Sequence, residues 1–425
     1  MYDAVEQIVR ILKRVVPESV VRPLRPAYHG ALAFFMALSY GFPARRLVVI
    51  GITGTKGKST TAEMLFALLR KAGHRTALLS TIRFAIEDAS EPNRFKMTLQ
   101  GRGFAQRFMR KALTAGCTHL VVEITSESVL DYRHWFLALD GLIVTNIQRE
   151  HIEHHGSFEN YVAAKRAIVA TLAGSPKKVR TLVANEDVPE TKTFLSMRGV
   201  RAIGFSQSEL SNLSGDDASV NFDYAGAHFS LPVPGTFNAS NALAAIKMAA
   251  ALGTPLDSMR EALATLAPIL GRVERIEVGQ DFLAVVDYAH TPDSLSALYG
   301  AFPRRRKICV LGNTGGGRDK WKRPLMGRIA DEACAVVILT NEDPYDEDPR
   351  DILSDMARGM QREPQVILDR REAIRYALSL AGKGDAVLVS GKGTDPFIMG
   401  PHGSKEPWSD AQVVREELVR LSAKA

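Results

Sequence analysis

The sequence predicts an α/β fold: a P-loop central domain on a mostly parallel sheet and a C-terminal Rossmann-like α/β domain, preceded by a short helical N-terminal segment. Three observations support this prediction. Short apolar runs alternate with helical stretches from residue 47 onward, as in parallel sheets covered by helices. A glycine-rich turn follows the first run, and a second alternating set begins after residue 268. The chain has 425 residues, more than one hydrophobic core usually organises.

Residues 1–46 form the predicted N-terminal segment. A first amphipathic helix is followed by a short apolar helix after Pro23 and Pro26, which ends near Pro43. We expect these helices to cap the next domain. The alternative is peripheral contact with a membrane surface, because basic residues flank an aromatic-rich face. The five apolar residues that define one face of the first helix are Val5, Ile8, Val9, Leu12 and Val15.

Residues 47–268 form the predicted central domain, and residues 269–425 form the C-terminal domain. Between the central strands and a hairpin at 219–231, residues 206–217 are polar and read as turns, and a helix is expected over 238–252. Because two α/β bodies follow one another, we expect the active site between them. The expected strands are 47–50, 77–79, 119–123, 142–145 and 181–184, then 282–287, 308–311, 335–340, 365–368 and 386–390.

The composition is that of a soluble globular protein, with 46% hydrophobic and 24% charged residues. The net charge is +7, but the Lys and Arg residues are dispersed, so we expect anionic small substrates or an acidic membrane surface and no nucleic acid. Cys117, Cys309 and Cys334 lie far apart and read as buried thiols in a reducing compartment. Without a leader-like start, we expect a cytoplasmic protein, with a peripheral membrane location left open.

A phosphate-binding loop is predicted where residues 51–60 read GITGTKGKST. A strand, a glycine-rich turn and a helix start present backbone N–H groups to phosphate, with Lys58 as a mobile cation and Ser59 as a magnesium ligand. The strict pattern has glycine where Ile52 stands, so this loop is a variant. We therefore expect a nucleoside triphosphate to contact Gly54, Thr55, Lys56, Gly57, Lys58, Ser59 and Thr60.

Two further segments follow buried strands. Glu123 ends one strand, where open α/β sheets place ligands, and its carboxylate suits magnesium. Residues 145–156 read TNIQREHIEHHG, whose imidazoles and carboxylates leave a zinc site open as an alternative, although the metalloprotease arrangement is missing. Lys165 lies on the following helix and can return toward the same place.

These motifs and their order resemble the Mur ligases, and most closely the MurE type. The resemblance covers residues 47 to 425 and implies an ATP-dependent ligase that activates a carboxylate as an acyl phosphate and joins it to an amino acid in peptidoglycan precursor synthesis. Its substrates would be a muramoyl-peptide-like acceptor and an amino acid. The segments that support the resemblance are GITGTKGKST at 51–60, EITS at 123–126, TNIQREH at 145–151, YVAAK at 161–165, GTFNASN at 235–241, GRVE at 271–274 and VDYAHTPD at 286–293.

The resemblance also implies roles for individual residues. Lys58, Lys165, His151 and Arg272 would be catalytic, with Arg272 reaching the γ-phosphate. Ser59 and Glu123 would bind one Mg²⁺, and His151 a second, while Lys165 would be carbamylated and become an oxygen ligand. The nucleoside would be held by Asn238 and Asn241 at adenine and by Asp287 at the ribose. Substrate contacts are expected from Thr98, Thr125, Ser126, Arg133, His290, Asp343, Tyr345, Gly391 and Asp395.

The chain departs from the MurE pattern in places. Only fifty residues precede Gly51, where the family's third-residue synthetases carry a uridine-binding domain, so an acceptor without UDP or one borne on a lipid stays open. Tyr345 replaces an arginine that grips the distal carboxylate of diaminopimelate, and residues 391–395 read GKGTD, so we expect lysine or another amino acid instead. Residues 312–320 form a glycine-rich loop expected to position the amino acid. Two alternatives stay open: a folylpolyglutamate, polyglutamate or cyanophycin-like ligase, and a non-catalytic nucleotide-binding scaffold.

Overall fold

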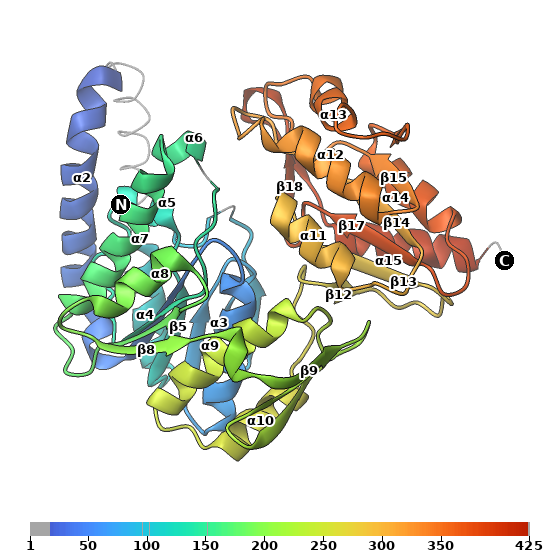
Figure 1. Cartoon of the computed structure of the whole chain (residues 1–425). Coiled ribbons are helices and arrows are strands. Elements are labelled where there is room, and N and C mark those ends of the chain that lie inside the picture. Colours follow the sequence, from blue (N-terminus) through green and yellow to red (C-terminus); the bar gives the residue numbers. More distant parts are fainter. Residues whose placement is uncertain (1–17, 96, 102, 151, 424–425) are drawn as a thin grey trace.

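The computed structural model describes residues 18–95, 97–101, 103–150 and 152–423 of the chain (Figure 1). The helix expected over residues 5–15 lies outside these residues. Helix α2 spans Glu18–Ser39 and the 3-10 helix η1 spans Pro43–Arg46. The second N-terminal helix was predicted to begin after Pro26. This prediction is wrong, because α2 runs through both Pro23 and Pro26. A proline removes one backbone hydrogen bond but keeps φ near the helical value, so a helix can continue past it.

The central domain is built on an eight-stranded sheet with the order β4-β3-β2-β5-β1-β6-β7-β8. All pairs are parallel except β2 with β3 and β3 with β4. The five predicted strands are confirmed, whereas β3, β4 and β8 were missed because they are short and, in β4 and much of β8, exposed. The strands are β1 Val48–Thr53, β2 Thr76–Leu79, β3 Arg83–Ile86, β4 Ala89–Pro92, β5 His119–Glu123, β6 Gly141–Val144, β7 Thr181–Asn185 and β8 Arg201–Phe205.

Helices cover both faces of this sheet, as its nearly continuous apolar strands require. One face packs on α3 and α9 and the other on α4 and α7, so the buried side chains form one cluster on each face. The helices of this domain are α3 Lys58–Lys71, α4 Phe104–Thr114, α5 Ser126–Leu130, α6 Ile152–His155, α7 Phe158–Ala173, α8 Pro189–Lys192, α9 Phe237–Ala251 and α10 Leu256–Ala264, with 3-10 helices η2 Thr193–Ser196 and η3 Gln207–Glu209.

A small antiparallel sheet extends the central domain. Its strands are β9 Ser211–Gly215, β10 Val220–Tyr224 and β11 Ala227–Leu231. The hairpin β10–β11 confirms the prediction. The prediction that residues 206–217 are only turns is wrong, since β9 lies there; its polar side chains are mostly exposed and carry no apolar alternation.

The C-terminal domain has a six-stranded sheet with the order β12-β13-β17-β14-β15-β16, and its five predicted strands are confirmed. Only β12 is antiparallel to its neighbour. The strands are β12 Glu274–Arg275, β13 Leu283–Asp287, β14 Lys307–Leu311, β15 Val336–Leu339, β16 Gln365–Val366 and β17 Ala386–Ser390, with a small pair β18 Phe397–Met399 and β19 Lys405–Pro407. The helices are α11 Pro292–Gly300, α12 Lys322–Ala333, α13 Pro349–Ala357, α14 Arg370–Ser379 and α15 Asp410–Ser422, with the 3-10 helix η4 Pro401–Gly403.

The cysteines differ in part from the prediction. Cys309 on β14 and Cys334 at the end of α12 form a disulfide, whereas Cys117 is free and buried. The helix that follows β14 returns beside it and brings the Cα atoms of the two cysteines to 6.1 Å. The pairing was not predicted, because the two cysteines lie 25 residues apart in the sequence. No described helix is long and apolar enough to cross a membrane.

Candidate functional site

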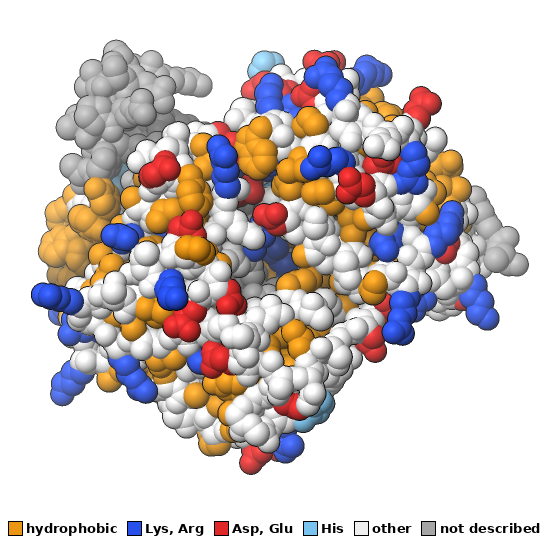
Figure 2. All heavy atoms as spheres, viewed as in Figure 1, with side chains coloured by type: hydrophobic (Ala, Val, Ile, Leu, Met, Phe, Trp, Pro, Cys, Tyr) orange, Lys and Arg blue, Asp and Glu red, His pale blue; other side chains and the backbone are white. Residues whose placement is uncertain are grey.

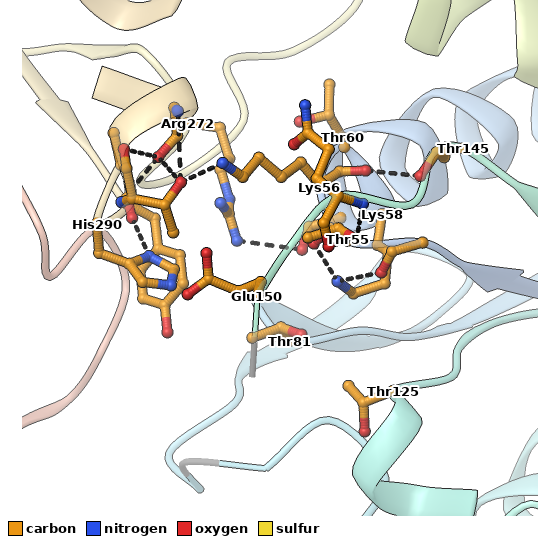
Figure 3. A pocket seen from close by; sticks show the side chains of 18 of the residues that line it. Thr55, Lys56, Lys58, Thr60, Thr81, Thr125, Thr145, Glu150, Arg272 and His290 are labelled. Atoms are coloured by element: carbon orange, nitrogen blue, oxygen red, sulfur yellow. Dashed lines mark hydrogen bonds between the residues drawn. The ribbon is translucent and has the colours of Figure 1, made fainter. Parts of the chain in front are cut away.

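A cavity of about 650 Å³ lies between the two domains, at the carboxyl ends of the strands, where the sequence predicted the site (Figure 3). Every predicted site residue that the structure describes lines this cavity, with one exception. Glu123 is fully buried directly behind the lining residues Ser59 and Thr81. His151 lies outside the described residues.

The phosphate loop depends on two glycines. Gly54 and Gly57 have φ values of 147° and 79°, which favour glycine. A Cβ on Gly57 would lie 2.2 Å from Asn241 Oδ1, and one on Gly54 would lie 2.0 Å from Thr145 Oγ1. Helix α3 begins at Lys58 immediately after the loop, so its first N–H groups face the cavity. This geometry favours an anion such as phosphate.

Lys58 folds back over the loop. Its Nζ donates to the carbonyl oxygens of Gly54 at 3.0 Å and Thr55 at 2.9 Å. Burial lowers the pKa of Lys58 to about 8, while Glu123 raises the pKa and Arg272 lowers it. Hydrogen bonds from an ammonium group to anionic phosphate oxygens are stronger than those to neutral carbonyls. We therefore expect Lys58 to exchange its two carbonyl contacts for phosphate oxygens when phosphate binds.

Glu123 is surrounded by hydroxyl groups. Its carboxylate accepts from Ser59 Oγ at 3.1 Å, from Thr81 N at 2.9 Å and from Thr81 Oγ1 at 3.0 Å. Arg272 Nη2 donates to the same Ser59 hydroxyl at 3.3 Å, from the C-terminal domain. These hard oxygen donors suit Mg²⁺. Thr81 was not predicted, although it follows the end of the strand at 77–79 and the same strand-end argument applies to it.

The zinc alternative has no support in the described part of the chain. Among the residues that the structure describes, no three His, Cys, Asp or Glu side chains are grouped to hold a metal ion. His155 is buried, and its Nε2 lies 3.1 Å from Ser126 Oγ.

Lys165 is buried below the phosphate loop, which is unusual for lysine. Its Nζ donates to Thr53 Oγ1 at 3.1 Å and to Gly54 O at 3.0 Å. Burial lowers the pKa of Lys165 well below its ordinary value, and Lys58 lowers it further. Tyr161, one turn earlier on α7, lies with its OH 2.8 Å from Thr55 Oγ1. Helix α7 thus supports the loop from beneath with a buried amine whose neutral form is favoured by burial.

The residues predicted to hold the nucleoside line the cavity. Asn238 Nδ2 donates to Pro234 O at 2.8 Å, and Asn241 Nδ2 donates to Asn238 Oδ1 at 3.0 Å. Asp287, at the end of β13, accepts from the backbone N–H groups of Val273 and Ala289, both at 2.7 Å. Burial raises the pKa of Asp287. These contacts fix the segment that carries Arg272.

Thr98, Thr125, Ser126 and Arg133, which were predicted to contact substrate, also line the cavity. Thr98 Oγ1 lies 2.7 Å from the hydroxyl oxygen of Thr81. Arg133 donates to Leu99 O at 3.2 Å and to Asp131 at 2.5 Å. Thr98 follows β4, and the other three residues lie on or beside α5, which follows β5. Thr98 is linked to Glu123 through the Thr81 hydroxyl.

Among the described residues, the side chains of four basic residues join the domains across the cavity. Lys322 Nζ lies 3.2 Å from Glu150 Oε1 in a buried ion pair, and Arg318 Nη1 lies 3.5 Å from Glu153 Oε1. Lys56 donates to Thr291 Oγ1 and lies 3.7 Å from Asp293, as Figure 3 shows for its extended side chain. The fourth of these side chains, that of Arg272, contacts Ser59. Lys322 and Glu150 were not predicted, because no local pattern relates residues 172 positions apart.

His290, which the sequence predicted to contact substrate, lines the cavity. Its Nδ1 lies 2.7 Å from Tyr288 O. Burial lowers the pKa of His290 well below its ordinary value, and Lys322 adds to this effect. The imidazole is therefore neutral at physiological pH.

Acidic residues gather at the C-terminal domain's end of the cavity. Asp343 accepts from Lys392 Nζ and from Met399 N, both at 2.8 Å, and Asp395 lies 3.1 Å from the same ammonium. Glu342, which lines the cavity, was not predicted as a site residue. Its Oε1 accepts from Thr314 Oγ1 at 2.9 Å, while its buried Oε2 has no hydrogen-bond partner among the described residues.

Gly391 leaves room for this carboxylate. A Cβ at Gly391 would lie 2.3 Å from Glu342 Oε2, and the glycine's φ of 108° is one that other residues rarely adopt. Burial raises the pKa of Glu342, and Asp343 adds to this effect. The unpaired oxygen makes this end of the cavity receptive to a cation.

Comparison with known proteins adds two domain matches. The Mur ligase middle domain matches residues 52–249, and the Mur ligase, glutamate ligase domain matches residues 271–393. A UDP-N-acetylmuramoyl-L-alanyl-D-glutamate–2,6-diaminopimelate ligase from Bacteroides fragilis is 33% identical over 89% of this chain and 79% of its own length. A UDP-N-acetylmuramyl-tripeptide synthetase from Roseiflexus sp. (strain RS-1) is 34% identical over 93% and 83%.

Solved structures agree with these matches. A structure of a UDP-N-acetylmuramoyl-L-alanyl-D-glutamate–2,6-diaminopimelate ligase has a TM-score of 0.60 at 26% identity, over 88% of this chain and 79% of the other. Folylpolyglutamate synthase from Mycobacterium tuberculosis has a TM-score of 0.70 at 19% identity, over 86% and 93%, and is similar in fold.

Proposed function

The chain belongs to the Mur ligase family, and on that premise we propose that it is an ATP-dependent ligase that joins a substrate carboxylate to the amine of an amino acid in peptidoglycan precursor synthesis. One observation supports this most: a single cavity collects the phosphate loop, Glu123 behind it, and Arg272 from the other domain. Such a cavity can hold a triphosphate and two further substrates between closing domains.

The proposed reaction has two steps. A carboxylate oxygen of the acceptor attacks the γ-phosphorus, the bond to the bridging oxygen of ADP breaks, and an acyl phosphate forms. The amine then attacks the acyl carbon, inorganic phosphate leaves, and the amine loses a proton. Lys58 and Arg272 would stabilise the charge on the transferred phosphoryl oxygens, because both reach the phosphate loop from different sides. The closed domains would exclude water from the acyl phosphate.

Magnesium fits the donors that the site offers. Ser59 Oγ and Glu123 Oε2 lie 3.1 Å apart, and both are hard oxygens. A bound Mg²⁺ would supply positive charge to the phosphate oxygens. We also propose that Lys165 is carbamylated. A carbamate forms when a neutral amine attacks carbon dioxide and loses a proton, and burial favours the neutral amine at Lys165.

The function is tested with an isotope. The protein is incubated with ATP, Mg²⁺, an amino acid and UDP-muramoyl dipeptide whose terminal carboxylate carries ¹⁸O. The expected result is an amide product by mass and one ¹⁸O atom in each inorganic phosphate released. A parallel reaction with muramoyl dipeptide lacking UDP identifies the acceptor. ADP release that does not depend on an amino acid, or phosphate without label, contradicts the proposal.

The amino acid is predicted to carry a second amine. The unpaired Oε2 of Glu342 favours the distal ammonium of lysine, whereas the distal carboxylate of diaminopimelate would face Glu342, Asp343 and Asp395. We expect kcat/KM for lysine to exceed that for diaminopimelate by about tenfold or more, roughly 1.4 kcal/mol. Product masses from a mixture of both amino acids measure this ratio.

Glu342→Gln should reduce the preference for lysine, because it removes the negative charge and keeps the shape. Glu332→Gln is the matched control, since Glu332 is exposed on α12. An unchanged preference in Glu342→Gln, or a preference of the parent for diaminopimelate, would show that this carboxylate does not select the amino acid.

The affinity for ATP is predicted to depend on pH through Lys58. Its pKa of about 8 in the free protein should rise when phosphate binds, so binding takes up a proton above pH 8. The Kd of a non-hydrolysable ATP analogue should be constant below pH 8 and increase by up to about tenfold per pH unit above it. Calorimetry in buffers of different ionisation enthalpy measures the proton uptake. Lys58→Arg, which stays protonated, should show a flat profile; the same slope in that variant would assign it to another group.

A further inference from the structure

An exposed apolar surface lies on the N-terminal side of the central domain. We call it the α2 surface and define it by Tyr28, Phe34, Phe35, Leu38 and Trp135. Phe35 is 61% exposed and Leu38 is 53% exposed, values unusual for such side chains gathered in one place. Figure 2 shows apolar side chains gathered at the left of the molecule, where Figure 1 shows α2.

The α2 surface is rigidly supported. The Phe34 ring lies 5.8 Å from that of Phe136 and 6.2 Å from that of Phe42. A Cβ on Gly30 would lie 3.0 Å from the Trp135 ring, so α2 packs closely on the loop that carries Trp135. The aromatic side chains are therefore held in place and are exposed among the residues that the structure describes.

Basic residues border the α2 surface. The Arg45 guanidinium lies 4.5 Å from the centre of the Phe42 ring, and Arg107 lies 5.6 Å from that of Phe104. A Cβ on Gly103 would lie 2.3 Å from Met36, so the start of α4 touches α2. Among the described residues of η1 and α4, the exposed basic side chains are Arg45, Arg46, Arg107, Arg110 and Lys111.

The α2 surface continues to the mouth of the cavity. Phe95 and Met97 line the cavity and are 52% and 43% exposed. Arg133 Nη1 lies 3.1 Å from Met97 Sδ, and the Phe95 ring lies 6.2 Å from that of Phe104. The apolar side chains thus extend from α2 past the Trp135 loop to the mouth of the cavity.

We propose that the α2 surface docks on the surface of an anionic lipid bilayer, with the mouth of the cavity facing the lipid. Exposed aromatic and aliphatic side chains would enter the interface between headgroups and acyl chains. The bordering arginines and Lys111 would lie at the level of the anionic headgroups, where each basic residue adds to the attraction. This charge complementarity favours a bilayer over a second copy of the chain, whose matching surface would carry the same positive border.

The test is cosedimentation of the full chain with vesicles. Vesicles of phosphatidylcholine with phosphatidylglycerol are compared with vesicles of phosphatidylcholine alone, at low and high salt. Binding is expected only with the anionic lipid and is expected to weaken with salt. Phe35→Ser with Leu38→Ser, and separately Arg107→Glu with Arg110→Glu, should each lower the partition coefficient tenfold or more. The matched controls, Val366→Ser with Val419→Ser and Arg304→Glu, should bind like the parent.

A spectroscopic measurement locates the contact. Brominated lipid should quench the fluorescence of Trp135, and the quenching should disappear in Trp135→Phe. The proposal would be overturned by no sedimentation with anionic vesicles, by equal binding of the surface variants and the parent, or by a dimer in solution that only the Phe35 and Leu38 variant loses. Loss of binding on deletion of residues 1–17, with no effect of the surface variants, would also overturn it and assign binding to that segment.

Discussion

Lys58→Ala is expected to lower kcat by about 1,000-fold, roughly 4 kcal/mol of transition-state stabilisation, in line with the loss of one preorganised charge donor. Its ammonium lies within 3.0 Å of two loop carbonyls and is placed to follow the γ-phosphoryl group as charge moves onto the leaving oxygen. Because the ground-state triphosphate also contacts the loop amides, Kd for ATP should change much less than kcat. Single-turnover rates and nucleotide titrations measure the two effects separately.

Lys71→Ala is the control for this variant. Lys71 ends the same helix, is 47% exposed and pairs with Glu261 at 3.0 Å, away from the cavity. Its turnover should equal that of the parent, and melting temperatures of both variants test the fold. If Lys58→Ala keeps more than about a tenth of the parent's kcat, the role proposed for its charge is wrong.

Lys165→Ala is expected to lower kcat by about 100-fold or more while leaving ATP binding within a few-fold of the parent. The reason is its proposed carbamate, which would replace an amine by an anionic oxygen ligand close to the phosphate loop. Added short carboxylates such as formate or acetate should restore part of the turnover, because they can fill the space and supply the oxygen. Turnover in bicarbonate and in carbon-dioxide-depleted buffer provides a second measurement on the parent.

Lys178→Ala is the control here, since Lys178 is exposed beyond the end of the same helix. It should behave like the parent and should not respond to carboxylates. Normal activity in Lys165→Ala would remove the proposed role. A loss that carboxylates do not rescue, together with a lowered melting temperature, would instead assign Lys165 to support of the loop through Thr53 and Gly54.

The sequence predicted those parts of the site that follow from local pattern. The phosphate loop, Glu123 at a strand end and Arg272 at the domain boundary each stand in a short motif, and each lines or adjoins the cavity. Thr81 was missed although it follows a predicted strand, because threonine at a strand end carries no strong signal by itself.

The contacts between distant segments could not be predicted. Lys322 and Glu150 form a buried pair only because two sheets present their carboxyl ends to each other. The polar strand β9 lacked alternation, since its side chains are mostly exposed and its stability comes from pairing with β10. The bond between Cys309 and Cys334 likewise depends on one helix returning beside its strand.

Lys56 links two events, the binding of nucleotide and the closing of the two domains. Its backbone N–H and carbonyl are held by Asn146 and Thr145 of the central domain, while its side chain reaches Thr291 and Asp293 of the other domain. The segment proposed to bind phosphate is therefore also a latch that holds the two domains together. Spent nucleotide should depart only as that latch opens, so the rate of opening would set an upper limit on turnover.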